Sequence, residues 1–387
     1  MKTPEKREDL ASEQFDTIVV GLGAMGSAAL YHLASRGVKV LGVDKYAPPH
    51  IHGSTHGRTR IIREAYYEHP CYVPIVQRAY ELWAALEREA GEPMFVQTGG
   101  IMIGPPEGLL FGGALRSAEE HGLAHEILEP AQVHERFPGF RVPDGSMALL
   151  ELRAGLLLPE KIVGAHLALA QRAGAAVRTG VTVTAWDADD GGVRLETDAG
   201  ELRARTLILA AGPWLPSLVP ELDLPLEIER QLFHWFEPAS HPEWYDAAHS
   251  PISLIEYADD RYFATFPDVG HGVKAGIHHE GAVIDIDAAR EGATPAEGRA
   301  MTELLARYLP QAAGRILDRA TCVYTNTPDH DFLVDRHPAH ANVLIASPCS
   351  GHGFKFASAI GEILADLVTK GETSFDLAPF ALARLQA

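Results

Sequence analysis

The chain has 387 residues, and 33 Lys and Arg against 52 Asp and Glu give it a formal net charge of −19. This acidic balance argues against nucleic acid or an anionic membrane surface as a partner, because both bind basic surfaces. With 46% hydrophobic and 22% charged residues the composition excludes a disordered chain, and the length suggests two domains.

Cysteine content and the first residues indicate the compartment. Three cysteines do not make a disulfide framework and suit a reducing environment. Residues 1–14 are charged and lack an apolar core, so we expect an N-terminal extension and not a secretory signal. Because no run of about 18 apolar residues occurs, no bilayer span is predicted, and we expect a cytoplasmic protein.

The first predicted elements form a βαβ unit. A buried strand is predicted over 17–20, and a glycine-rich turn over 21–26 leads into a helix that ends near Arg36. A second buried strand over 38–43 ends at Asp44. A polar loop follows at 47–60.

The later predicted elements alternate between α/β and strand-rich segments. Helices are expected at 72–90, 114–121, 160–173, 296–308 and 356–370. Strands are expected at 99–104, 176–186, 193–197, 201–204, 206–211 and 342–346, with further short strands over about 226–320. This order predicts a discontinuous two-domain protein. One domain comprises 15–90, 150–225 and 320–387, and the other comprises 91–149 and 226–319.

The turn after the first strand carries the pattern G-x-G-x-x-G at Gly21, Gly23 and Gly26. Such glycines permit a tight turn, close approach of a pyrophosphate and packing of the helix on the strand. The helix N-terminus offers free N–H groups to the phosphates, and Asp44 is placed to bind both ribose hydroxyls. An acidic residue there disfavours a 2′-phosphate, so the pattern predicts FAD or NAD binding and not NADP.

Two further segments favour FAD over NAD. The strand at 206–211 with Gly212 resembles a second motif near the flavin in flavoproteins of the glutathione reductase type, whose fingerprint also opens the folded chain. The loop from Ser350 to Phe356 resembles their closing flavin contact. We therefore predict an α/β plus α+β protein, with a Rossmann-like FAD-binding domain of the glutathione reductase type and a second, sheet-rich substrate domain.

From about Asp16 to about Phe380 the chain resembles the monomeric sarcosine oxidase family, which also contains N-methyltryptophan oxidase. Four segments carry the resemblance: GLGAMGSAA at 21–29, DKYAPPH at 44–50 with GSTHGRTRIIR at 53–63, CVYT at 322–325, and SGHGFKF at 350–356. The second and fourth are specific, whereas the first alone is not.

The resemblance implies which residues hold the cofactor. They are Gly21, Gly23, Ala24, Met25, Gly26, Asp44, Lys45, Ser54, His56, Thr59, Gly212, Cys322, Gly351, Gly353, Phe354 and Lys355. It implies that FAD is covalent, with the sulfur of Cys322 joined to the flavin 8α carbon. A thiolate is a strong nucleophile, which suits this attachment. Cys349 remains a rival attachment site.

The resemblance also implies the catalytic and substrate-binding residues. Arg63 and Lys355 match the pair that binds the substrate carboxylate, a role for which a guanidinium and an ammonium are suited. Lys274 matches the lysine near flavin N5, where its charge would stabilise superoxide.

Other matched residues line the flavin or the substrate. Arg60 would favour the anionic reduced flavin, His278 would help keep the bound amine neutral, and Tyr324 would lie over the substrate. Phe263 stands where sarcosine oxidases carry a pocket Tyr, and this more apolar pocket leaves room for larger N-methyl or cyclic amino acids.

The predicted function is an FAD-dependent amine oxidase that converts sarcosine, O2 and water to glycine, formaldehyde and H2O2. Alternatives are an oxidase of a larger N-methyl amino acid or of a pipecolate-like amino acid, a dehydrogenase that uses another electron acceptor, and an NAD-binding regulatory protein. The predicted partners are an amino acid and O2, and we expect a monomer or weak oligomer. The spacing of His50, His52 and His56 lacks supporting Cys or Glu, so no metal site is predicted.

Overall fold

The computed structural model describes residues 14–288 and 291–386, so residues 1–13 of the expected N-terminal extension lie outside the described residues. The chain divides into two compact units. Unit 1 comprises the described residues of Met1–Thr55, Glu160–Leu226 and Thr325–Ala387, and unit 2 comprises those of His56–Pro159 and Glu227–Tyr324. This division places residues 56–90, 150–159 and 320–324 in unit 2, whereas the sequence analysis grouped them with the dinucleotide-binding segments, and it places residue 226 in unit 1.

Unit 1 is built on an eight-stranded mixed sheet with the path β10-β11-β12-β1-β2-β9, to which β19 and β18 are added next to β12. Its strands are β1 (Gln14–Val20), β2 (Val40–Asp44), β9 (Ala176–Thr179), β10 (Val183–Asp189), β11 (Gly192–Thr197), β12 (Gly200–Leu209), β18 (Leu333–His337) and β19 (His340–Ser347). Its helices are α1 (Ala24–Ser35), α5 (Pro159–Arg172), α6 (Leu215–Leu218) and α8 (Ala357–Thr369).

The parallel strands of unit 1 end together at one edge. Val20 of β1 lies opposite Val43 of β2 and Leu209 of β12, and Leu209 in turn lies opposite Ile345 of β19. The segments that follow these four strands therefore lie along the same carboxyl edge, which is where α/β sheets bind ligands.

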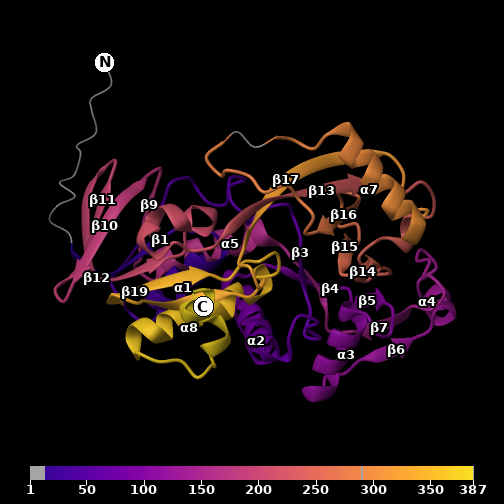
Figure 1. Ribbon diagram of the computed structural model, residues 1–387, viewed down its shortest axis with the longest axis horizontal. Helices are drawn as coiled ribbons and strands as arrows, with labels where there is room; N and C mark the ends of the chain where they lie inside the picture. The colour runs from indigo at the N-terminus through magenta and orange to yellow at the C-terminus, as the bar shows by residue number, and fades with distance from the viewer. Residues whose placement is uncertain (1–13, 289–290, 387) are drawn as a thin grey trace. The chain divides into compact units, whose positions relative to one another are not determined.

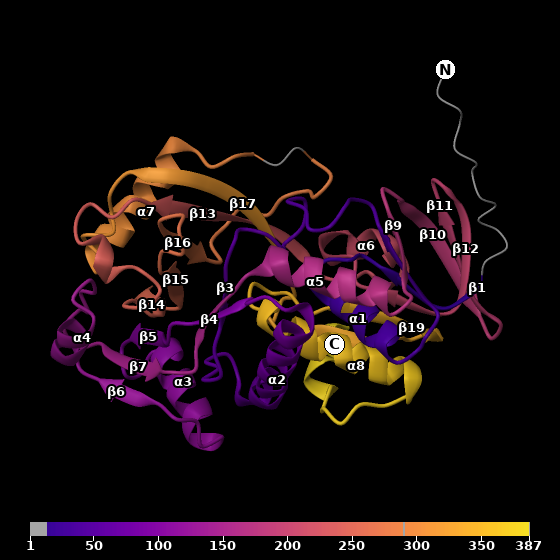
Figure 2. The same ribbon diagram turned by 180° about the vertical axis from the view of Figure 1, so that it is seen from behind.

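Two helices at the ends of the chain pack tightly in unit 1. Figures 1 and 2 show α1 and α8 side by side, although the sequence separates them by more than 300 residues. A Cβ on Gly361 of α8 would lie only 2.6 Å from Cβ of Ala28 in α1. The small residues thus allow the first and last helices of the unit to approach closely.

Two predicted strand boundaries in unit 1 were wrong. The single strand expected at 176–186 is interrupted at Gly180, whose φ is +69°, and becomes β9 and β10. The strands expected at 201–204 and 206–211 are one continuous strand, β12. This strand pairs antiparallel with β11 over 200–204 and parallel with β1 over 203–209, except that Arg205 is not aligned with β1.

Unit 2 is rich in strands, as predicted. Its large sheet has the order β17-β13-β16-β15-β14-β5-β7-β6, and a small sheet has the order β3-β8-β4. The strands are β3 (Arg60–Ile62), β4 (Phe95–Gln97), β5 (Gly100–Gly104), β6 (Glu126–Leu128), β7 (Met147–Glu151), β8 (Gly155–Leu157), β13 (Glu227–Phe236), β14 (Ile252–Ala258), β15 (Arg261–Phe266), β16 (Val273–His278) and β17 (Ile316–Asn326).

The helices of unit 2 are α2 (Val73–Ala90), α3 (Leu109–Glu120), α4 (Pro130–Arg136) and α7 (Pro295–Tyr308). Helix α7 starts with a capping box, in which Thr294 and Glu297 accept each other's backbone N–H. No helix in the described ranges is long and apolar enough to cross a membrane.

Candidate functional site

The glycine-rich turn of unit 1 is tied to the second strand by Asp44. The Asp44 carboxylate accepts the backbone N–H of Leu22 at 2.8 Å and that of Tyr46 at 2.7 Å. A Cβ on Gly26 would lie 1.7 Å from the Gly21 carbonyl oxygen, so only glycine fits there. The turn, the strand end and the start of α1 are therefore held as one rigid unit.

Gly23 differs from Gly26 because packing within unit 1 does not require it. The atom nearest to an added Cβ is Thr55 Oγ1, at an ordinary contact distance of 3.5 Å. Gly23 is also the N-cap of α1, has no side-chain capping bond, and precedes a first turn without acidic residues, which begins with Ala24 and Met25. One N–H of this helix start, that of Ala24, donates to Thr55 Oγ1 at 3.3 Å, and the space beside Gly23 fits a pyrophosphate.

The neighbouring residues of the carboxyl edge fit a nucleotide as well. Lys45 is exposed, and its Nζ lies 5.6 Å from the Tyr46 ring centroid and 5.7 Å from that of Trp214. Gly212, with φ +55°, begins a short 3₁₀ helix after β12 and has no atom within 4 Å of an added Cβ. Ser54 is half-buried in the loop that precedes Thr55.

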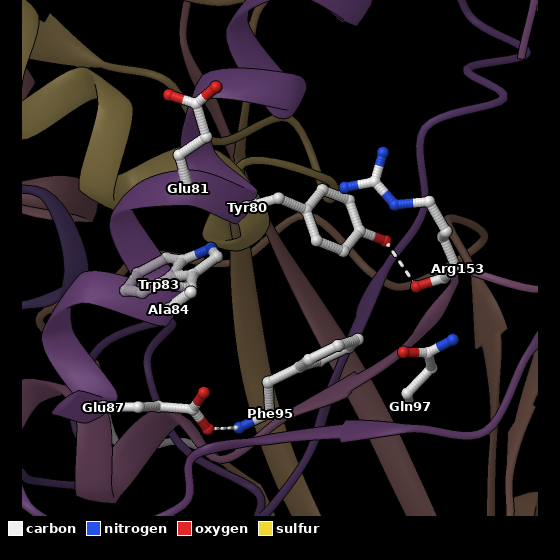
Figure 3. Close-up of a pocket in the computed structure, with 8 residues that line it drawn as sticks. All are labelled: Tyr80, Glu81, Trp83, Ala84, Glu87, Phe95, Gln97 and Arg153. Carbon is white, nitrogen blue, oxygen red and sulfur yellow. Dashed lines mark hydrogen bonds between the residues drawn. The ribbon is translucent and has the colours of Figure 1, made fainter.

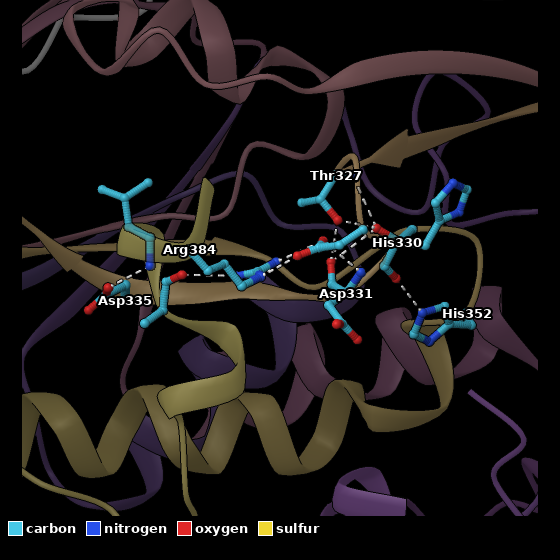
Figure 4. A network of polar contacts seen from close by, with 10 residues as sticks. Thr327, His330, Asp331, Asp335, His352 and Arg384 are labelled. Carbon is cyan, nitrogen blue, oxygen red and sulfur yellow. Dashed lines mark hydrogen bonds and ion pairs between the residues drawn. The ribbon is translucent and has the colours of Figure 1, made fainter. Parts of the chain in front are cut away.

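The loop after β19 is fixed by the polar network drawn in Figure 4. The carbonyl of Asp331 accepts hydrogen bonds from Thr327 Oγ1 at 2.7 Å and from Ser350 Oγ at 3.1 Å. His352 Nε2 lies 2.9 Å from the His330 carbonyl, and the His352 ring stacks on Phe332. These contacts hold both ends of the loop.

Four predicted residues lie in this loop and the turn that follows it, namely Gly351, Gly353, Phe354 and Lys355. A Cβ on Gly353 would lie 1.7 Å from the Pro348 carbonyl oxygen, and Gly351 has φ +79°. Lys355 is 5% exposed, and its Nζ donates to the His352 carbonyl at 2.6 Å. Phe354 is half-buried and begins a 3₁₀ turn. Lys355 is thus a buried cation on a fixed loop.

Cys349 precedes this loop. It is partly buried, and its Sγ accepts the backbone N–H of Thr325 at 3.3 Å.

In unit 2 the structure brings Lys274, Arg60 and Cys322 together around the ring of Phe233. Lys274 Nζ lies 4.0 Å and Arg60 Cζ 5.0 Å from the Phe233 ring centroid. Cys322 packs against Phe233 and Trp235 in a buried cluster. Two cations and one thiol from distant parts of the sequence therefore share one aromatic side chain.

Lys274 is buried in a set of neutral acceptors. Only 1% of its surface is exposed, and Nζ donates to the carbonyls of Gly57 and Thr59 at 2.9 and 2.8 Å and to Thr59 Oγ1 at 3.3 Å. These bonds hold the ammonium without neutralising its charge. His56, 5% exposed, directly precedes this segment.

Arg60 and Cys322 are direct neighbours. Arg60 Nη2 lies 3.6 Å from Cys322 Sγ, and Nη1 donates to the Thr59 carbonyl at 2.9 Å. Cys322 is 1% exposed. The Cys322 thiol also donates to the Val323 carbonyl, with 3.6 Å between Sγ and the oxygen.

Arg63 lies in a pocket of tyrosines and is paired with Glu68. Its Nη2 donates to the two oxygens of Glu68 at 2.9 and 2.7 Å, and Nη1 donates to the Ala65 carbonyl at 2.8 Å. Burial alone would lower the pKa of Arg63, but Glu68, Tyr66 and Tyr67 raise it overall.

One donor of Arg63 has no acceptor. Its Nε is buried and makes no hydrogen bond within the described residues. The Arg63 guanidinium is therefore a charged, desolvated group with one free donor position.

His278 and Tyr324 are also brought together. His278 Nδ1 lies 3.2 Å from the Tyr324 hydroxyl, and the Tyr324 ring also lies edge-on to His279, with centroids 5.4 Å apart. Phe263, by contrast, is fully buried in the core of unit 2, where it packs on Tyr308 and Tyr257.

Two acidic residues of this region were missed from the sequence. Glu68 pairs with Arg63 as described, and Glu151 at the end of β7 accepts the backbone N–H groups of Glu64 and Ala65. An acidic residue five positions after Arg63 was a usable signal for the first. Glu151 could not be found, because its hydrogen bond to the Glu64 N–H joins residues 87 positions apart.

A surface pocket of about 280 Å³ lies along α2 and is shown in Figure 3. It is lined by Tyr80, Glu81, Trp83, Ala84, Glu87, Phe95, Gln97 and Arg153. It contains none of the residues that the sequence analysis assigned to the cofactor or substrate. No group of three or more His, Cys, Asp or Glu suited to a metal ion occurs in the described residues.

A comparison with protein families identifies the chain. The sequence pattern of a family described as FAD dependent oxidoreductase matches residues 16–367. The chain belongs to the FAD dependent oxidoreductase family. The glycine-rich turn, Asp44 and the open helix start of this oxidoreductase fit the nucleotide part of FAD.

Named relatives of this oxidoreductase match nearly its whole length. It is 40% identical over 380 residues to monomeric sarcosine oxidase from Streptomyces avermitilis, which covers 97% of this chain and 99% of that protein. It is 38% identical over 374 residues to N-methyl-L-tryptophan oxidase from Citrobacter koseri, which covers 96% of this chain and 99% of that protein. The family resemblance predicted from the sequence motifs is confirmed.

Solved structures confirm the predicted fold class. NikD, described as an unusual amino acid oxidase essential for nikkomycin biosynthesis, matches with a TM-score of 0.83 and 25% identity, covering 96% of this chain and 98% of that chain. L-proline dehydrogenase from P. horikoshii matches with a TM-score of 0.83 and 22% identity, covering 97% and 98%. The second likeness shows the fold alone.

Proposed function

We propose that this oxidoreductase oxidises a secondary amino acid, with sarcosine as the first candidate, to give glycine, formaldehyde and H2O2 from sarcosine, O2 and water. The observation that carries the proposal is the 40% identity over 97% of the chain to a protein named monomeric sarcosine oxidase. The buried cations Arg63, Lys274 and Lys355 support it, because a carboxylate substrate and reduction of O2 both need positive charge.

Unit 1 would hold the nucleotide end of FAD. Asp44 would accept the ribose hydroxyls, and the N–H groups at the start of α1 beside Gly23 would bind the pyrophosphate. When bound, FAD supplies the redox chemistry: it accepts a hydride equivalent from the carbon next to the amine and passes electrons to O2.

We further propose that FAD is attached covalently through Cys322. Arg60 Nη2, 3.6 Å from Cys322 Sγ, supports it because a cation lies beside the sulfur that would be joined to the flavin. Cys349 is the weaker candidate, because in the described part of the chain its sulfur accepts the backbone N–H of Thr325 and no guanidinium donates to it.

Arg63 would bind the substrate carboxylate. Its buried Nε lacks an acceptor within the described residues, and a carboxylate oxygen can take that position. Lys355 would add a second positive charge at the substrate.

Lys274 would supply fixed charge for O2 reduction. Its hydrogen bonds to the Gly57 and Thr59 carbonyls and to Thr59 Oγ1 hold Nζ in place, and its positive charge would stabilise an anion that forms from O2. No reorganisation of the ammonium is needed at that moment, because the side chain is already buried and bonded.

The pair of His278 and Tyr324 would act on the substrate amine. The hydrogen bond between His278 Nδ1 and the Tyr324 hydroxyl orients both groups. A neutral His278 can accept the proton that a substrate amine must lose before its carbon releases hydride.

A larger N-methyl amino acid or a cyclic amino acid is the second candidate substrate. The chain is nearly as similar to proteins named N-methyl-L-tryptophan oxidase, at 38% identity, as to the sarcosine oxidases. Phe263 lies in the core, so its hydroxyl-free ring keeps that part of unit 2 apolar.

A substrate panel tests the proposed function. The colour of the purified protein is recorded, the protein is mixed with sarcosine, N-methyltryptophan, pipecolate and proline, and H2O2 release is measured for each. Release with one of them supports an oxidase and identifies its substrate. Reduction of an artificial electron acceptor without H2O2 indicates a dehydrogenase, and colourless protein that binds NAD indicates the regulatory alternative.

We also infer cytoplasmic placement and a monomer or weak oligomer. None of the three cysteines forms a disulfide within the described residues, which suits a reducing compartment. Analytical ultracentrifugation measures the oligomeric state directly.

A further inference from the structure

A buried carboxylate lies behind the segment that carries Arg63. Glu151, at the end of β7, is 1% exposed. Its Oε1 and Oε2 accept the backbone N–H of Glu64 at 2.8 and 3.0 Å, and Oε2 also accepts that of Ala65 at 2.8 Å. A carboxylate buried this deeply stabilises the fold only when its oxygens accept hydrogen bonds, and here both oxygens do so.

The two residues that Glu151 holds are the ones that follow Arg63. The Arg63 side chain also contacts this segment, because its Nη1 donates to the Ala65 carbonyl. The Ala65 peptide is therefore fixed on both sides, with its N–H on Glu151 and its carbonyl on the guanidinium. A shift of this short segment would move the Arg63 guanidinium directly.

The environment of Glu151 makes its charge sensitive to pH. Burial raises the pKa of Glu151 to about 7, and the backbone N–H groups of Ala65 and Glu64 oppose that rise. The charged and titratable groups that face it are the Glu64 carboxylate, the Arg63 guanidinium and the Tyr80 hydroxyl. Arg153, seen beside Tyr80 in Figure 3, pairs with Glu64 and not with Glu151.

We propose that Glu151 is a positioning residue for substrate binding: its anionic form holds the Glu64–Ala65 backbone and so places the Arg63 guanidinium for the substrate carboxylate. The inference rests on the proposed function, since it assumes that Arg63 binds that carboxylate. A protonated Glu151 loses one acceptor position and gains a donor that faces backbone N–H groups, so it holds the segment less well.

The test uses the flavin-containing enzyme and acetate as a probe of carboxylate binding. The dissociation constant of acetate is measured from the change in flavin absorbance between pH 6 and 8.5, a range in which acetate stays ionised. For the wild type we expect affinity to weaken as the pH falls through about 7. Glu151→Gln should bind acetate about tenfold more weakly at pH 8.5 and show no step near pH 7, because loss of one charge-assisted hydrogen bond has about this effect.

Two variants complete the test. Glu151→Asp keeps the charge, so it should recover part of the affinity and keep a pH step. Glu64→Gln is the matched control: it changes the neighbouring buried carboxylate, leaves the backbone N–H groups in place, and should keep the wild-type affinity within about twofold. Wild-type affinity or an unchanged pH step in Glu151→Gln overturns the inference, as does an equal loss in Glu64→Gln.

The wild-type titration tests the inference even if Glu151→Gln fails to fold. An acetate affinity that does not change between pH 6 and 8.5 contradicts the inference by itself. Failure of the proposed function appears differently. In that case the wild type releases no H2O2 with any secondary amino acid, and Arg63→Ala binds acetate as the wild type does.

Discussion

The ion pair of Arg63 and Glu68 should stabilise unit 2 and, if Arg63 binds the substrate carboxylate as proposed, should also affect the affinity for carboxylates. The Arg63 side chain is 2% exposed and that of Glu68 17%, and their shortest contact is 2.7 Å. Removing one partner of such a buried pair costs about 3–5 kcal/mol. In Glu68→Gln the glutamine amide oxygen retains one hydrogen bond of about 1 kcal/mol, so the expected loss in free energy of unfolding is about 2–4 kcal/mol.

The same substitution should have the opposite effect on anion binding. Glu68→Gln removes a negative charge beside Arg63 and leaves the guanidinium without its counter-charge. Acetate should therefore bind about tenfold more tightly, which corresponds to about 1.4 kcal/mol. Acetate should also restore part of the lost stability, because a ligand that binds only the folded state stabilises it.

Urea unfolding with and without acetate measures both effects. Glu81→Gln is the control, since Glu81 forms an exposed pair with Arg78 in which the glutamate is 68% exposed, and its loss should change stability by less than about 1 kcal/mol. The reasoning is refuted if Glu68→Gln lowers stability no more than the control and leaves acetate affinity unchanged.

Three other predictions concern the cofactor, O2 and acid stability. Acid-precipitated wild-type protein should stay yellow, and so should Cys349→Ser. Cys322→Ser should release its flavin to the supernatant. Release of flavin from the wild type would exclude a covalent bond. Lys274→Met should slow reoxidation of the reduced enzyme by O2 by about 100-fold in stopped flow and slow its reduction by substrate far less, and equal slowing of both steps would remove the O2 role. Burial lowers the pKa of His166 to about 3, so protonation of the unfolded chain should destabilise the fold as the pH falls from about 6.5 toward 3. His166→Phe should reduce that loss by roughly 3–5 kcal/mol, and urea unfolding curves that keep the wild-type pH dependence would contradict the assignment.

The sequence predicted the parts of the fold that depend on local patterns. The turn at Gly21 to Gly26 and the helix after it follow from glycine positions and hydrophobic spacing, and Asp44 from its place at a strand end. The predicted strand at 176–186 failed because period-two hydrophobicity continues through Gly180, where the backbone turns with positive φ. Local patterns do not show which neighbour a strand pairs with.

Sequence motifs proposed which residues form the candidate site, but they predicted only part of the contacts among these residues. The motif around Arg60 and the position of Cys322 indicated a flavin, but their contact across 262 residues is a product of the tertiary fold. Glu151 carried no sequence signal, because its role depends on two backbone N–H groups more than 80 residues away. Buried carboxylates that bind backbone have no side-chain motif to reveal them.

The most direct test of the proposed reaction is its product balance. Purified enzyme is incubated with sarcosine and O2, and formaldehyde, glycine and H2O2 are measured together. We expect the three products in equal amounts, and a larger N-methyl amino acid should likewise yield equal H2O2 and formaldehyde. If flavin-containing enzyme consumes neither O2 nor any secondary amino acid of the panel, the proposed function is wrong.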